Sequence, residues 1–74
     1  MEATTVWREI MACKVCIGDT LVFDSPYGER RYRVTRTQRH GGNIEIMGDG
    51  IGEGTPPMGF WDGPRTATLR IVGY

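Results

Sequence analysis

The sequence predicts a small, mainly β domain whose four or five strands curl into a partly open barrel. Short segments rich in β-branched and aromatic residues alternate apolar with polar side chains, which is the period of a half-buried strand. Eleven glycines and four prolines among 74 residues favour turns over long helices. A flat sheet of this size would leave one face wet and both edges open, whereas a curled sheet protects a core.

The length is that of a single domain, 1–74. Its core must be small, so we expect marginal stability unless a metal, a disulfide or an oligomer interface adds support. No apolar run approaches the roughly 20 residues of a membrane-spanning helix, and the first residues do not resemble a signal peptide. The expected location is the cytoplasm, and two cysteines do not make a secreted disulfide framework.

Residues 1–14 fit either a short helix or a strand. The apolar side chains of this segment fall on one helical face at Val6, Trp7, Ile10 and Met11. The run Thr-Thr-Val-Trp favours a strand instead. We expect the helix, with Trp7 covering the small core.

Residues 15–74 hold the strands of the expected barrel. A Gly-Asp turn precedes the strand 20–23, the strands 30–40 and 44–47 form a hairpin, and the last strand is 65–74. The side chains expected to face inward are Leu21, Phe23, Tyr32, Val34, Ile44, Ile46, Ala67, Leu69 and Ile71. By the same alternation, the side chains expected to face outward on the strand 30–40 are Arg31, Arg33, Thr35 and Thr37.

Residues 48–64 show no periodic pattern, and we expect one long Gly/Pro-rich loop there. Loops of this length are uncommon in compact domains and often carry function. Met58, Phe60 and Trp61 form its apolar tip. Two roles fit this tip, folding back to cap the barrel or standing out as a partner anchor. Both hold if the loop packs against a second copy of the chain.

The pattern Ile17-Gly18-Asp19-Thr20-Leu21-Val22-Phe23, followed by the strand-turn-strand from 31 to 47, resembles SH3-like and KOW-type small barrels. In those folds a Gly-Asp turn opens the first barrel strand. The resemblance covers residues 15–50 and implies an SH3-like, partly open barrel, in which the 48–64 loop has no counterpart. In size and composition the chain also resembles the small accessory proteins encoded by bacteriophages.

Charge is balanced overall but divided along the chain. Nine basic and nine acidic residues give a net charge of zero, which disfavours a generic nucleic-acid binder. Residues 30–40 contain five arginines and no acid, whereas 41–63 contain four acids and no base. Either the two segments neutralise each other across the sheet or they form opposite surface patches. Arg31 and Arg33 share a face, which Arg70 would extend.

The candidate chemistry is sparse. Cys13 and Cys16 form a C-x-x-C motif, and His40 is the only other strong metal ligand, whereas a structural zinc site needs four. A redox motif would need a thioredoxin-like βαβ setting. Neither a nucleophile–base pair nor a phosphate-binding glycine motif is present. We therefore expect no catalytic residue, no cofactor and no enzymatic activity, with two ordinary thiols as the first interpretation and a zinc site as the second.

These observations predict an interaction module that binds another protein, with a second copy of the chain as one candidate. The apolar contacts are assigned to Met58, Phe60 and Trp61. The residues assigned to charge complementarity are Arg31, Arg33, Arg36 and Arg70. The alternative is a nucleic-acid-binding barrel, in which the arginine strand tracks phosphates and the stacking side chains are Tyr27, Tyr32 or Trp61.

Overall fold

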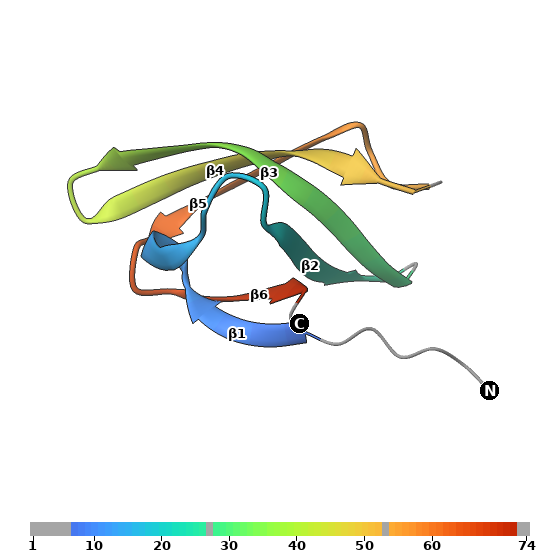
Figure 1. The fold of residues 1–74 in the computed structure, drawn as a ribbon, viewed down its shortest axis with the longest axis horizontal. Helices are drawn as coiled ribbons and strands as arrows, with labels where there is room; N and C mark the ends of the chain where they lie inside the picture. The colour runs from blue at the N-terminus through green and yellow to red at the C-terminus, as the bar shows by residue number, and fades with distance from the viewer. Residues whose placement is uncertain (1–6, 27, 53, 73–74) are drawn as a thin grey trace.

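The computed structural model describes residues 7–26, 28–52 and 54–72, which form one six-stranded antiparallel sheet and a single 3₁₀ turn (Figure 1). The elements are β1 (Trp7–Met11), η1 (Ala12–Lys14), β2 (Thr20–Ser25), β3 (Gly28–His40), β4 (Asn43–Ile51), β5 (Met58–Pro64) and β6 (Thr68–Val72). The mainly β class is confirmed, with six strands rather than four or five. No helix within the described residues is long and apolar enough to cross a membrane.

The order of the strands across the sheet is β1-β6-β2-β3-β4-β5. Strands β2 to β5 form a meander, and β6 returns to lie between β1 and β2. The sheet curls so that β3, β4 and β5 pass over β6 and β1 (Figure 1). Backbone hydrogen bonds tie η1 to the turn before β6, from Ala12 N to Ala67 O at 2.8 Å and from Cys13 N to Arg65 O at 3.0 Å.

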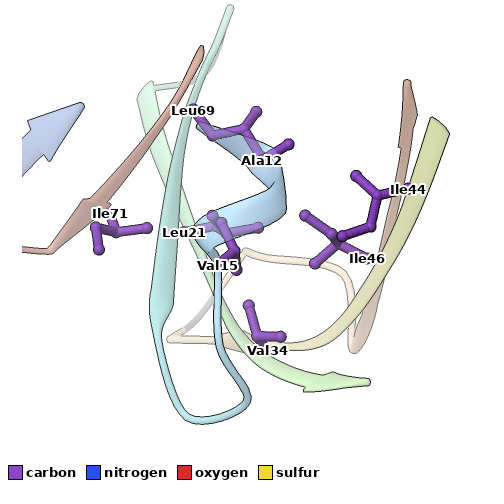
Figure 2. Packing of buried hydrophobic residues seen from close by; sticks show 8 residues of the cluster. All are labelled: Ala12, Val15, Leu21, Val34, Ile44, Ile46, Leu69 and Ile71. Carbon is purple, nitrogen blue, oxygen red and sulfur yellow. The ribbon is translucent and has the colours of Figure 1, made fainter. Parts of the chain in front are cut away.

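The core fills the concave face of this sheet, which we call the inner face. Its buried cluster consists of Ala12, Val15, Leu21, Val34, Ile44, Ile46, Leu69 and Ile71 (Figure 2). Six of these side chains were expected from strand alternation. The other three side chains expected to face inward, Phe23, Tyr32 and Ala67, are half-buried. Ala12 and Val15 were not expected, and Figure 2 shows them entering the cluster from the segment around η1.

The expected N-terminal helix is wrong, because the described residues of that segment form β1 and the turn η1; Val6 lies outside the described residues. β1 pairs with β6, which places Ile10 opposite Leu69. This pairing spans almost the whole chain, so no local pattern reveals it. Trp7 does not cap the core either. It is 43% exposed on the outer face, with the Arg70 guanidinium 5.0 Å from its ring centroid.

The expected 48–64 loop is also wrong, because strands occupy most of it. β4 continues to Ile51 and β5 begins at Met58, so the connection is only 52–57. The glycines within the strands permit close contacts: a Cβ at Gly48 would lie 2.7 Å from Arg33 O, and one at Gly50 would collide with Pro56 O. Glycine here marks crowding at strand contacts rather than a turn.

A β-bulge at Thr35 interrupts the alternation of β3. Val34 lies opposite Gly48 and Arg36 lies opposite Met47, so Thr35 has no partner in the register. Beyond the bulge every side chain changes face relative to the expected pattern. Thr37, expected to face outward, therefore lies on the inner face opposite Ile46, and Arg36 points outward.

Candidate functional site

The outer face of β3, β4 and β5 gathers arginines and large apolar side chains. Residues directly opposite each other on antiparallel strands share a face. One row across the three strands is Arg33, Asp49 and Met58, and the next is Arg36, Met47 and Phe60. We define the outer patch as Arg33, Arg36, Met47, Met58 and Phe60. The bulge at Thr35 completes this patch, because it moves Arg36 onto the face that Arg33 already occupies.

The apolar part of the outer patch is exposed to solvent. Met58 is 67% exposed and Phe60 is 62% exposed, and the two side chains neighbour each other on β5. A single exposed apolar residue is ordinary on a protein surface, and Ile17, 68% exposed at a turn, is such a case. Two large neighbours beside a half-buried methionine form a patch of the kind that protein interfaces cover.

The arginines of the outer patch do not pair with the acids across the sheet. Arg33 lies directly opposite Asp49 in the register, yet no hydrogen bond or ion pair joins the side chain of Arg33 or Arg36 to any described residue. Across β3 and β4 the contact of this kind between described residues joins His40 Nε2 to Glu45 Oε2 at 3.2 Å, and it is an ion pair when His40 is protonated. Mutual neutralisation of the two charged segments is therefore incomplete, and both guanidinium groups remain available to a partner.

The other residues predicted to bind a partner lie elsewhere or are already engaged. Arg31 shares the outer face but forms a two-point contact with Glu29 Oε2, at 3.2 Å from Nε and 3.0 Å from Nη2. Arg70 pairs with Asp24 Oδ2 at 2.9 Å while it covers Trp7. Trp61 faces inward opposite Ile46 and packs half-buried against the core.

Of the stacking candidates in the nucleic-acid alternative, Tyr32 is half-buried on the inner face, as is Trp61. Tyr27 lies outside the described residues. The structure thus brings together Arg33, Arg36, Met58 and Phe60 from the predicted set. Arg31 shares their face but contacts Glu29, whereas Arg70 and Trp61 lie elsewhere.

The inner face contains a cavity of about 270 Å³ between the β2–β3 and β4–β5 hairpins. Its lining consists of Leu21, Phe23, Arg30, Tyr32, Ile46, Gly48, Gly59, Phe60 and Trp61. Phe23 and Tyr32 meet edge to face with ring centroids 6.0 Å apart. The Tyr32 ring packs against Gly59 of β5, where an added Cβ would stand 2.5 Å from Tyr32 Cδ1, and so forms one wall of the cavity.

Arg30 is the charged residue of this lining, and its guanidinium has no hydrogen bond or ion pair with the residues that the structure describes. Sequence reasoning did not select Arg30. The strand alternation could have identified Arg30, because Arg30, Tyr32 and Val34 are each two residues apart and point to the same, inner face. A charged residue at an inward position is uncommon, so it is a candidate for a functional role.

The residues considered for zinc do not form a metal site. Within the described ranges, no three side chains of His, Cys, Asp or Glu come close enough together to hold an ion. His40 is paired with Glu45, and both cysteines are free thiols, with Cys16 exposed and Cys13 half-buried. Cys13 instead contributes its carbonyl oxygen, which accepts a hydrogen bond from Arg39 Nη2 at 3.4 Å.

Comparison with known proteins returned no matching family model, no matching curated protein and no matching solved structure.

Proposed function

We propose that this protein is a non-enzymatic interaction module that binds another protein through the outer patch, on an SH3-like, partly open barrel. The observation that supports it best is the position of exposed Met58 and Phe60 beside two arginines whose side chains have no partner among the described residues. Aromatic, methionine and arginine side chains are the types enriched in the centres of protein interfaces.

The two kinds of side chain would contribute differently to binding. Burying a side chain such as that of Phe60 against a partner stabilises a complex by about 1.5–3 kcal/mol. Arg33 and Arg36 would act on orientation and association rate, because exposed charges steer an approaching partner more than they raise its affinity. The partner is thus expected to present acidic side chains around an apolar centre.

A protein partner fits the outer face better than a nucleic acid does. The arginines of the outer patch share their face with three acids, because Asp49 lies in the row of Arg33, and Glu45 and Asp62 lie in the row next to that of Arg36. The acids on this face would repel the phosphates of a nucleic acid, whereas a protein surface can carry charges that complement both the acids and the arginines. Nucleic-acid binding remains the alternative, and binding of mixed oligonucleotides that weakens steeply with salt would support it.

The test compares substitutions in the outer patch with matched substitutions outside it. The tagged full chain captures partners from its native host, and light scattering measures its mass across concentration to detect a second copy as the partner. Phe60→Ala is paired with Ile17→Ala, since both remove an exposed apolar side chain. Arg33→Ala is paired with Arg65→Ala, since both side chains are exposed. Circular dichroism checks that each variant is folded.

We expect Phe60→Ala to weaken binding about tenfold or more, which is ~1.4 kcal/mol, while Ile17→Ala and Arg65→Ala leave it unchanged. Arg33→Ala should give a smaller loss, mainly in the association rate. The proposal fails if folded Phe60→Ala and Arg33→Ala bind a captured partner, or self-associate, as strongly as the unaltered chain.

A further inference from the structure

Among the residues that the structure describes, no strand lies along one long side of β5. β5 is the last strand in the sheet order and pairs with β4 alone within the described residues. Its backbone N–H and C=O groups on the far side therefore lack a ladder, and such an edge is a template for an added strand. The side chains that flank this edge alternate between the outer patch, with Met58 and Phe60, and the inner face, with Gly59 and Trp61.

The cavity on the inner face begins at this same edge. Gly59, Phe60 and Trp61 of β5 all contribute to its lining, and Gly48 lies next to Gly59 in the register. Because neither glycine has a side chain, the Tyr32 ring packs across Gly48 and against Gly59, and the rings of Tyr32 and Trp61 form two walls of the cavity. A large apolar side chain that entered the cavity from the β5 edge would contact both of these aromatic rings.

The position of Arg30 adds a charge requirement. Along β3, Arg30 lies two residues beyond Tyr32 on the side away from Trp61, so it stands at the far end of the cavity. Its guanidinium has no partner among the described residues, and no acidic side chain lines the cavity. A carboxylate that reached this end would gain a charge-assisted, forked hydrogen bond.

We propose that the free edge of β5 accepts an extended segment of the partner protein as a seventh strand. In this segment a large apolar residue enters the cavity and contacts the Tyr32 and Trp61 rings. An acidic residue two positions further along the same face, toward the Pro57 end of β5, pairs with Arg30. The intervening residues point outward and contact Met58 and Phe60. This inference rests on the proposed function and specifies how that partner is recognised.

A second copy of the chain matches these requirements less well. On β5 itself the acid Asp62 shares the outer face with Phe60, so no acid accompanies inward-facing Trp61. On β1, the opposite edge, Trp7 and Glu9 do have the required spacing, but the Arg70 guanidinium already lies 5.0 Å from the Trp7 ring. Pairing β1 of one copy with β5 of the next is also head-to-tail, which tends toward open chains of subunits.

The test uses synthetic peptides with the unaltered full chain, followed by calorimetry. The probe peptide alternates threonine with valine, phenylalanine and glutamate, so that phenylalanine and glutamate lie two apart on one face. We expect it to bind, and replacing its glutamate by glutamine should weaken binding about tenfold. The protein variant Arg30→Gln should bind the glutamate peptide about tenfold more weakly, and it should bind the glutamine peptide no more weakly than that. The control variant Arg65→Gln should bind both peptides as the unaltered chain does.

Backbone pairing is tested separately with N-methylated peptides. An extended peptide has two edges, and it would pair with β5 through only one of them. N-methyl groups on the amides of the pairing edge should abolish binding, whereas N-methyl groups on the amides of the opposite edge should leave binding unchanged. Equal effects at both edges, or none, overturn strand addition. Because the peptide variants leave the protein unaltered, this result does not depend on how well any protein variant folds.

The remaining outcomes separate this inference from the proposed function. If the probe peptide does not bind while partner capture still depends on Phe60, strand addition is wrong and the proposed function stands. If neither the peptide nor any Phe60-dependent partner binds, both fail. If the mass rises with concentration and Trp7→Ala reverses the rise, the occupant is a second copy. If oligonucleotides displace the peptide in a salt-dependent way, the cavity binds nucleic acid, and the inference is overturned.

Discussion

The ring of Tyr32 lies directly against the backbone of Gly59, although the two residues belong to strands that are not neighbours. A Cβ at Gly59 would stand 2.5 Å from Tyr32 Cδ1 and 2.6 Å from Cε1. The ring reaches across β4 because Gly48, in the strand between them, has no side chain to block it. This contact joins β3 to the edge strand β5 and sets one wall of the cavity.

Gly59→Ala is therefore expected to destabilise the fold. The added methyl group must displace the Tyr32 ring, and such overpacking lowers the free energy of unfolding by about 1–3 kcal/mol. Gly42→Ala is the matched control, because a Cβ at Gly42 meets no atom within 4 Å. Urea denaturation measures both variants, and equal midpoints for the two would show that Tyr32 and Gly59 are not in tight contact.

The core on the inner face should be sensitive to loss of volume. Ile46 is 1% exposed and belongs to the buried cluster, so Ile46→Ala should lower the free energy of unfolding by about 2–5 kcal/mol. The stability of a small domain is of the same order, so this variant is expected to melt at a much lower temperature. Ile51→Ala, on the same strand but 39% exposed, should cost far less. Similar melting temperatures for both would contradict this placement of the core.

The contact of Arg70 with Trp7 should contribute to folding and not to partner binding. We expect a coupling free energy of about 0.5–1 kcal/mol between the two side chains, as for cation–π pairs near the surface. A double-mutant cycle with Arg70→Met and Trp7→Leu, followed by chemical denaturation, measures it. Zero coupling would mean that the two side chains do not interact, and a loss of partner binding in folded Arg70→Met would place the interface elsewhere.

Salt should affect association through the outer patch. Because the Arg33 and Arg36 side chains are exposed, increasing ionic strength should slow the association with a captured partner. In the double variant Arg33→Gln with Arg36→Gln, association at low salt should be slower and its salt dependence reduced, with little change in dissociation. Surface-immobilised partner and flowing protein give both rates. An unchanged salt dependence would exclude these two arginines from steering.

Much of the fold could be predicted from local alternation. The inward positions of Leu21 and Ile71 are confirmed because the alternation of their strands is not interrupted, and that of Val34 is confirmed because it precedes the bulge in β3. Strand β1 could not be predicted in the same way, because its partner β6 lies at the other end of the chain. The strands within 48–64 were missed because glycine there relieves crowding, and composition alone does not separate that role from a turn.

The candidate site was partly predictable for the same physical reasons. The residue types at Met58, Phe60 and Arg33 indicate an interface, but their sharing of one face depends on strand register. The register, in turn, depends on the bulge at Thr35, and no residue near Thr35 predicts a bulge. The sequence analysis assigned Trp61 and Phe60 to one apolar surface because they are adjacent in the chain. Adjacent residues of a strand point to opposite faces, so Trp61 packs against the core and Phe60 faces solvent.

Hydrogen–deuterium exchange of the full chain, with and without its captured partner, tests most directly whether the partner binds at the outer patch and the β5 edge. We predict that added protection falls on β4 and β5, and is strongest at the backbone amides of 58–63, while β1 is unchanged. Protection concentrated on β1 and η1, with β5 exchanging as in the free chain, would contradict it.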